Sequence, residues 1–252
     1  MAREHTVVRG IVLRGTDTKE SDKILTVLTA GMGKLKVIAK GARSRRSRVA
    51  AAVQTLAYSE MVLAESRGWQ YLSEASTIAL FDGVRKDVEL LALACYLAEL
   101  TEQVTYEEAE SGEILSLLLN ALYALDTLHR PQALVKAAFE LKLMSLIGFE
   151  PLAERCAVCG REDPQEPVLD LRGGVVRCRG CGGGSGAPLT HGALAAVRHV
   201  LYGDPKRLYS FTLAPEDQRR FTQAAEGYVQ AMLERDFRTL SFYKSLRAAE
   251  GQ

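Results

Sequence analysis

The first 80 residues alternate between apolar and polar positions, as short strands do. Five runs show this period of two: TVVRGIVLR, KILTVLT, KLKVIAK, SEMVLAE and WQYLSEAS. Between the second and third runs, Gly31 and Gly33 can adopt positive φ, which indicates a hairpin. Five short strands without room for a crossover helix predict a small closed barrel, either an OB-fold or, as the alternative, an SH3-like barrel.

After Phe81 the apolar spacing changes to about 3.6 residues, which is typical of amphipathic helices. Residues 87–104 and 110–128 have wide apolar faces. The next helix is predicted to begin at Pro131 and to end at a left-handed Gly148. Its interior is apolar on most sides, so we expect it at the centre of a helical domain.

A segment rich in Cys and Gly interrupts the helical pattern. Helices resume after Thr190, a predicted N-cap, stop at Gly203 and begin again near Pro215. The sequence therefore predicts a multidomain α+β protein: an N-terminal five-stranded OB-fold barrel, an α-helical domain and an inserted four-cysteine zinc-binding module. The expected parts are the barrel over 1–80, a first helical part over 81–150, the insert over 151–188 and a second helical part over 189–252.

Charge is distributed unevenly along the chain. The whole sequence has a net charge of only +1, with 32 basic and 31 acidic residues. Residues 1–80 contain 13 basic and 7 acidic residues, a balance of +6, and the remaining 19 basic and 24 acidic residues give −5. A basic front predicts a polyanionic partner. With no apolar run of about 18 residues and no secretory signal at the start, the sequence predicts a cytoplasmic protein without a membrane partner.

The segment GKLKVIAKGARSRRSR concentrates the positive charge, in a stretch with no acid between Asp22 and Glu60. Strand alternation places its lysines on an outer face of the barrel, and its arginines extend from the following loop. Such a row predicts contacts with a nucleic-acid backbone and little sequence preference. A solvated loop that keeps the protein soluble is the alternative. The candidate DNA-binding residues are Lys34, Lys36, Lys40, Arg43, Arg45, Arg46 and Arg48.

Four cysteines form two C-x2-C pairs separated by eighteen residues: Cys156, Cys159, Cys178 and Cys181. This arrangement is typical of a structural zinc site, because each pair aims two thiolates at one point. We expect one Zn²⁺ per chain, with Gly160 and Gly182 forming the sharp turns beside it. Free thiols or a disulfide are the alternative. A catalytic zinc is disfavoured because four sulfurs fill the coordination shell.

The sequence offers no catalytic motif. AGMGKLK lacks the spacer and the hydroxyl residue of a phosphate-binding loop, and no His is followed two residues later by Glu, as zinc deaminases require. His191 is interpreted as a surface residue at a helix start and Cys95 as a small buried apolar residue. The sequence therefore predicts a protein that is not an enzyme and hydrolyses neither nucleotides nor DNA.

Two segments resemble the bacterial RecO family of recombinational repair proteins. They are GIVLRGTDTKESDKILTVLTAGMGKLKVIAKGARSRRSR and FELKLMSLIGFEPLAERCAVCG, which runs into the first cysteine pair. The resemblance implies an OB-fold, a helical domain and a zinc module. It also implies binding of single- and double-stranded DNA, annealing of complementary strands, action with RecR, and help in loading RecA onto DNA covered by single-stranded-DNA-binding protein. The segment AAVQTLAYSE departs from the family pattern and leaves the path of the chain after Arg48 open.

Two rival functions remain from the residues alone. One is an RNA-directed zinc-ribbon nuclease or modifying enzyme that uses the barrel for docking. The other is a scaffold whose zinc module is an interaction surface. Turnover that depends on divalent ions would identify the first, and loss of DNA binding in a variant of the basic run would separate the second from a DNA-binding protein.

Overall fold

The computed structural model describes residues 5–182 and 185–250, and the chain divides into two compact units. Unit 1 comprises Met1–Thr127 and Phe237–Gln252, and unit 2 comprises Leu128–Asp236. The four parts expected from the sequence remain a prediction. Unit 1 combines the barrel with helices that precede unit 2 in the sequence and with the helix that follows it.

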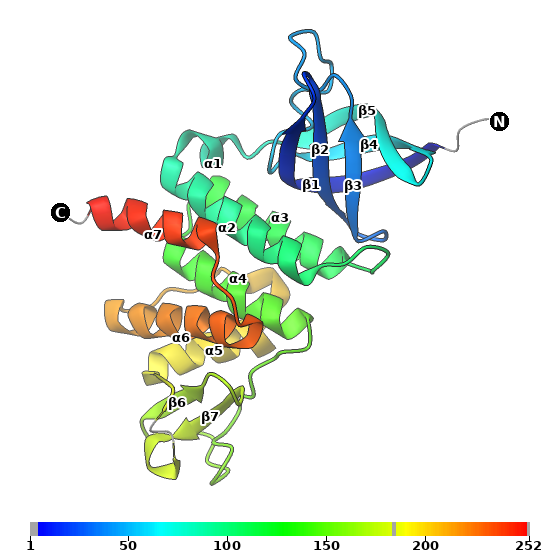
Figure 1. Ribbon diagram of the computed structural model, residues 1–252. Helices are drawn as coiled ribbons and strands as arrows, with labels where there is room; N and C mark the ends of the chain where they lie inside the picture. The colour runs from blue at the N-terminus through cyan, green and yellow to red at the C-terminus, as the bar shows by residue number, and fades with distance from the viewer. Residues whose placement is uncertain (1–4, 183–184, 251–252) are drawn as a thin grey trace. The chain divides into compact units, whose positions relative to one another are not determined.

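The N-terminal part of unit 1 is a closed five-stranded barrel with the strand order β1-β2-β3-β5-β4 (Figure 1). Neighbouring strands are antiparallel except β3 and β5, which pair in parallel. The predicted OB-like barrel is therefore confirmed. The strands are β1 (His5–Thr18), β2 (Asp22–Thr29), β3 (Lys34–Ala39), β4 (Tyr58–Ser66) and β5 (Trp69–Ala79).

The barrel core follows from the alternation along the strands. In β3, Val37 and Ala39 are buried, whereas Lys36, the residue before Val37, is exposed. Val12, Val27 and other inward apolar side chains complete the cluster. Apolar burial of this kind is what stabilises a small barrel.

The β2–β3 turn uses only one of its two predicted glycines in the left-handed region. Gly33 has φ +64°, whereas Gly31 does not adopt positive φ. A Cβ added to Gly33 would lie 2.3 Å from the carbonyl oxygen of Tyr106. The same carbonyl accepts a hydrogen bond from the backbone N–H of Lys34 at 2.9 Å. Gly33 is thus required by its conformation and by the close approach of the segment after α2.

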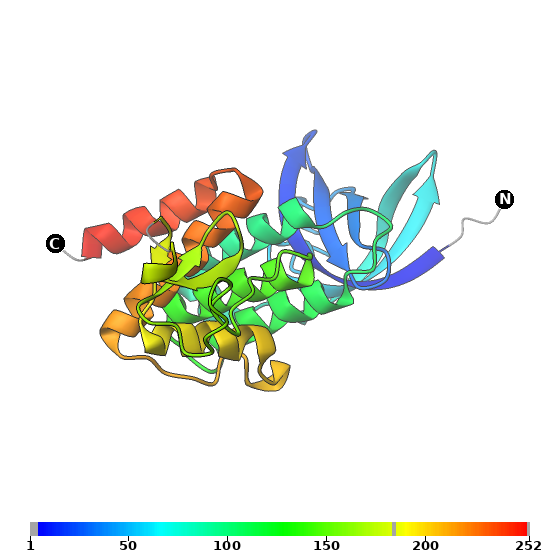
Figure 2. The ribbon, with the colours of Figure 1, turned by 90° about the horizontal axis from the view of Figure 1, so that it is seen from below.

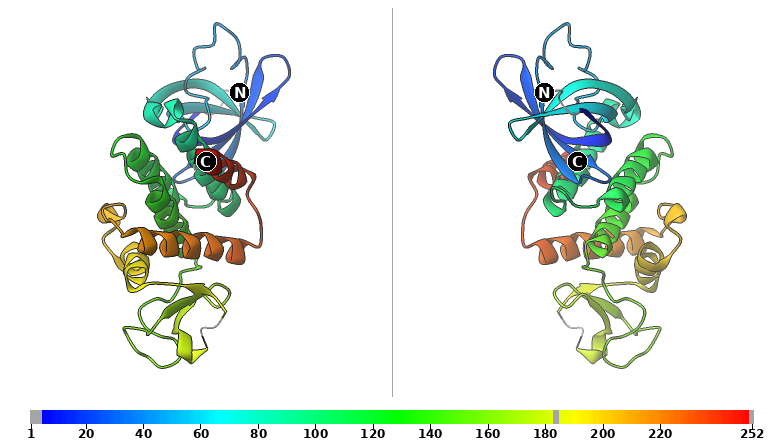
Figure 3. Two further views of the ribbon diagram at one scale, coloured as in Figure 1. Left: turned by 90° about the vertical axis from the view of Figure 1, so that its left-hand side faces the viewer. Right: turned by 90° about the vertical axis from the view of Figure 1, so that its right-hand side faces the viewer.

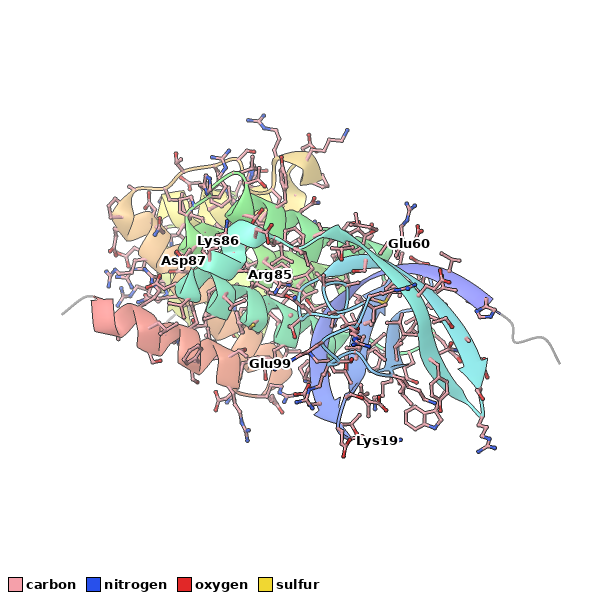
Figure 4. All side chains as sticks on the ribbon, turned by 90° about the horizontal axis from the view of Figure 1, so that it is seen from above. Lys19, Glu60, Arg85, Lys86, Asp87 and Glu99 are labelled. Atoms are coloured by element: carbon pink, nitrogen blue, oxygen red, sulfur yellow. The ribbon has the colours of Figure 1, made fainter. Side chains whose placement is uncertain are left out.

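Four helices belong to unit 1: α1 (Asp82–Lys86), α2 (Val88–Val104), α3 (Gly112–Asp126) and α7 (Arg238–Glu250). The carboxylate of Asp87, labelled in Figure 4, caps α2 by accepting from the N–H groups of Glu89 and Leu90. The end of the chain packs on α2, where the rings of Tyr96 and Phe237 meet edge to face with centroids 5.7 Å apart. The last helix is therefore part of unit 1.

Unit 2 contains α4 (Gln132–Leu146), α5 (His191–Tyr202) and α6 (Pro215–Leu233), together with a small sheet of β6 (Pro167–Asp170), β7 (Val175–Cys178) and β8 (Ala187–Pro188). Pro131 is the N-cap of α4, so this helix begins one residue later than predicted. Gly148 ends it with φ +89°, as predicted. Thr190 caps α5 by accepting from the N–H of Ala193 at 3.0 Å, which is also confirmed.

Helix α4 lies at the centre of unit 2, packed against α5 and α6. Its core is not purely apolar. The ammonium of Lys136 lies 2.7 Å from a carboxylate oxygen of Glu140 and 2.9 Å from one of Glu226. Burial would lower the pKa of Lys136, but the two carboxylates outweigh it and raise this pKa. No local pattern in the sequence signals this buried charge group.

Candidate nucleic-acid interface and metal centre

Two of the candidate basic residues, Lys34 and Lys36, lie in β3, and the other five lie in the connection from β3 to β4. We call residues 40–48 the basic loop. The connection leaves the barrel at the end away from α2 and α3 (Figure 3). The side chains exposed to solvent are those of Lys36, Lys40, Arg43, Arg45, Arg46 and Arg48.

Lys34 differs from the other six candidate residues. It is half-buried, and its ammonium donates a hydrogen bond of 2.7 Å to the carbonyl oxygen of Glu102 on α2. The carboxylate of Glu102 accepts three hydrogen bonds from Arg14 on β1, at 2.7, 3.1 and 3.2 Å. These contacts link the barrel to α2, so the cation of Lys34 is already engaged by the protein's own backbone.

The path of the chain after Arg48 is a series of turns that returns to the barrel. Leu56 donates its N–H to the carbonyl of Val12 at 2.7 Å, and Val12 donates to the carbonyl of Ala57 at 3.0 Å. Both contacts fall beside the irregularity between Val12 and Arg14, where the register of β1 shifts. The connection thus forms hydrogen bonds with β1 beside its bulge.

Arg85 fixes the same connection from α1. Its guanidinium donates to the carbonyl of Leu80 at 2.6 Å, to the carbonyl of Thr55, and to the side-chain oxygen of Gln54 at 3.1 Å. Arg85 lies where the chain passes from the barrel into α1 (Figure 4). Burial lowers its pKa below the ordinary value for arginine. No local motif signals this contact in the sequence.

Two further contacts shape the electrostatics of the basic loop. The ammonium of Lys40 lies 5.0 Å from the centre of the Tyr71 ring on β5, a cation–π contact. The guanidinium of Arg43 lies 3.3 Å from the carboxylate of Asp17 on β1. The hairpins β1–β2 and β4–β5 that carry these partners project from the barrel as separate ribbons (Figure 2). The exposed cations can contact phosphates, which carry no sequence information.

The four predicted cysteine ligands come together in unit 2. Their sulfur atoms all lie within 4.8 Å of one another, and those of Cys159 and Cys178 are 3.9 Å apart. Four sulfurs at about 2.3 Å from a tetrahedral zinc would be about 3.8 Å apart. Cys156 and Cys178 are buried, Cys181 is half-buried and Cys159 is exposed. The cluster therefore fits a four-thiolate zinc site.

Backbone turns aim these sulfurs at one point. Gly160 and Gly182, which follow the two pairs, adopt φ +74° and +87°, as expected for sharp turns beside a metal. The N–H of Cys178 donates to the sulfur of Cys156 at 3.3 Å. Burial raises the pKa of Cys156, but backbone N–H groups around its sulfur outweigh this effect and lower the pKa to about 6. These backbone N–H groups thus favour the thiolate of Cys156, the form that binds metal.

Arg198 on α5 anchors the segment that carries the first cysteine pair. Its guanidinium donates to three backbone carbonyls, those of Ala153 at 2.8 Å, Glu154 at 2.8 Å and Glu162 at 2.6 Å. A single arginine in a helix gives no sequence signal for this role. His191 begins α5 with an exposed side chain 3.9 Å from Asp163, as predicted for a surface residue.

Cys95, the fifth cysteine, is half-buried on α2, and burial raises the pKa of its thiol. Separately, none of the helices in the described part of the chain combines the length and the apolar character needed to cross a membrane.

Comparison with known proteins covers nearly the whole chain. Residues 1–81 match the family model for the recombination protein O N terminal, and residues 85–241 match that for the recombination protein O C terminal. The DNA repair protein RecO of Symbiobacterium thermophilum is 33% identical over 250 residues, covering 96% of this chain and 98% of its own. The DNA repair protein RecO of Acetivibrio thermocellus is 28% identical over 239 residues, covering 94% and 95%.

These descriptions name recombination and DNA repair and no catalysed reaction, in agreement with the expectation of a non-enzymatic protein. The matched regions include both the barrel with its basic loop and the segment with the four cysteines. The chain belongs to the RecO family of recombination and DNA repair proteins.

Proposed function

We propose that the chain is a recombination mediator that binds single- and double-stranded DNA through the basic loop and Lys36. The supporting observation is the group of six exposed cations, one on β3 and five in the basic loop that follows it. Each phosphate contact releases counterions, so such a surface binds DNA with little sequence preference. Binding two strands at once would offset the repulsion between their backbones, and this is how we propose that the protein anneals complementary DNA.

The further steps of the proposal involve other proteins. With RecR, the chain would help load RecA onto DNA covered by single-stranded-DNA-binding protein, in the cytoplasm at the nucleoid. Residues 81–127 contain 2 basic and 10 acidic residues, a balance of −8, and include α1, α2 and α3. We propose that these helices contribute protein contacts, because their charge repels phosphates.

We also propose one structural zinc ion per chain, held by Cys156, Cys159, Cys178 and Cys181. The ion would order an insert too small to order itself by apolar burial. A closed shell of four thiolates leaves no position for a reacting water.

The DNA proposal is tested by fluorescence anisotropy on labelled single and double strands across a salt series. The test variant replaces Lys40, Arg43, Arg45 and Arg46 by Ala. If each residue neutralises one phosphate, the slope of log K against log salt falls in magnitude by about 3 to 4. Strand annealing should fall in parallel. A matched control replaces four exposed basic residues of unit 2 by Ala: Arg155, Arg161, Lys206 and Arg207.

The control should keep the slope of the wild type, and both variants should keep its circular dichroism spectrum. A folded loop variant with wild-type salt dependence and annealing would show that the loop serves solubility and that DNA binds elsewhere.

A further inference from the structure

A carboxylate lies at the start of the basic loop, although a negative charge at this position would by itself weaken the attraction between the loop and DNA. Asp22 is the half-buried first residue of β2, and its oxygen Oδ1 accepts a hydrogen bond of 2.8 Å from the N–H of Gly41. Beside it, the carbonyl of Ser21 accepts from the N–H of Arg43 at 2.9 Å. Between these contacts Ala42 is 4% exposed and packs into the barrel core. Three consecutive residues are thereby fixed to the barrel.

The rest of the loop is built on these fixed residues. Ser44 donates its N–H to the carbonyl of Gly41 at 3.0 Å, and Ser47 donates to the carbonyl of Ser44 at 2.9 Å. The turns that carry Arg45 and Arg46 therefore start from the residue that Asp22 holds. Gly41 has φ +64° with no atom within 4 Å of an added Cβ, so its local contacts come from hydrogen bonds rather than from side-chain packing.

We propose that Asp22 is a positioning residue that holds the basic loop in its DNA-binding conformation. This inference rests on the proposed function of the loop. A fixed loop binds more tightly because its cations need not be ordered when DNA arrives. The geometry therefore predicts that removing this acid weakens DNA binding, although removing a negative charge beside DNA should by electrostatics alone strengthen it.

Asp17 provides the matched comparison. Its carboxylate is 55% exposed and lies 3.3 Å from the guanidinium of Arg43 and 4.0 Å from the ammonium of Lys23. It is thus an acid at the same loop that contacts side-chain cations. Replacing Asp17 by Asn tests the effect of charge without removing the acceptor for Gly41.

The experiment compares the full-length variants Asp22→Ala, Asp22→Asn and Asp17→Asn by anisotropy on labelled DNA and by hydrogen exchange of residues 40–48. Asp22→Ala should bind about fivefold or more weakly than wild type, with faster exchange in the loop. Asp22→Asn keeps an oxygen that can accept from Gly41 and removes one negative charge, so it should bind at least as tightly as wild type. Asp17→Asn should do the same.

Two outcomes would overturn the positioning role. One is an Asp22→Ala variant that binds as tightly as wild type, while the quadruple loop variant loses binding. The other is an Asp22→Asn variant as weak as Asp22→Ala, since the acceptor would then be irrelevant. A quadruple variant that binds like wild type would instead refute the proposed function itself. Added to a quadruple variant that has lost binding, Asp22→Ala should cause no further loss.

Discussion

Replacement of Cys178 by Ser should weaken zinc binding sharply and loosen the insert. Cys178 is buried at the end of β7, and its sulfur lies 3.9 Å from that of Cys159. A serine hydroxyl is a poor ligand for zinc beside three thiolates, so the site would be left with three good ligands. The barrel belongs to the other compact unit and should keep its structure.

The magnitude follows from the number of ligands. Structural zinc contributes about 10 to 16 kcal/mol in small zinc-dependent modules at neutral pH. Shared among four thiolates, this is about 2.5 to 4 kcal/mol for each one. Loss of Cys178 should therefore reduce zinc affinity about a hundredfold to a thousandfold. A whole domain is stable by only about 5 to 15 kcal/mol, so the loss of one zinc ligand is large enough to open the insert locally. The helices around the insert should stay folded.

The assay combines elemental analysis of reduced protein with a zinc-chelator titration and hydrogen exchange. We expect one zinc per wild-type chain, a lower zinc affinity in Cys178→Ser, and faster exchange in residues 151–188 but not in the barrel. Cys95→Ser is the matched control, because Cys95 is half-buried on α2 outside the cluster. A Cys178→Ser variant with wild-type zinc affinity and exchange, or a wild-type chain without zinc, would show that the four cysteines do not form a structural zinc site.

Three further substitutions test the packing within each of the two units. Gly33→Ala should lower the free energy of unfolding by about 2 to 4 kcal/mol, measured with denaturant, because its Cβ would meet the carbonyl of Tyr106 and its φ is positive. Lys34→Ala should lower it by about 1 to 2 kcal/mol and leave the salt slope of DNA binding unchanged, because its ammonium binds a backbone carbonyl. Lys136→Met should cost about 3 to 5 kcal/mol near pH 7, because it leaves the fully buried Glu140 without this cation.

Controls and contrary results differ for each substitution. Gly68 is the control for Gly33, because it has φ +74° with open space around it. Gly68→Ala should therefore cost only about 1 kcal/mol. An equal loss at Gly33 and Gly68 would show that the clash with Tyr106 does not matter. Lys36→Ala is the control for Lys34→Ala. It should reduce the salt slope of DNA binding by about 1 in magnitude, whereas Lys34→Ala should leave the slope unchanged. The raised pKa of Lys136 means that its stabilisation is present below about pH 10.4 and is lost as pH rises through the folded pKa. In Lys136→Met the loss of stability at alkaline pH should disappear. If it persists, another group causes it.

Several parts of the protein could be predicted from local patterns in the amino-acid sequence. A period of two produced the five strands, and the spacing of the cysteines produced the cluster in unit 2. Thr190 and Gly148 marked helix ends because a cap or a left-handed residue acts within a few positions of itself. Each of these features depends on neighbours that are close along the chain.

Which basic side chains are available to a ligand, and which groups hold them, depends on contacts that form only in the folded chain. Lys34 resembles Lys36 in the sequence, but its ammonium meets a carbonyl that lies 68 residues away. Asp22 holds the basic loop from 19 residues away, and Arg85 holds the later part of the β3–β4 connection, at Gln54 and Thr55, from about 30 residues away. The last helix returns to α2 after the whole of unit 2. Such pairs leave no periodic trace, because they depend on how the chain folds back. The same charge pattern can therefore face solvent or pair with the protein, and only the folded chain distinguishes the two.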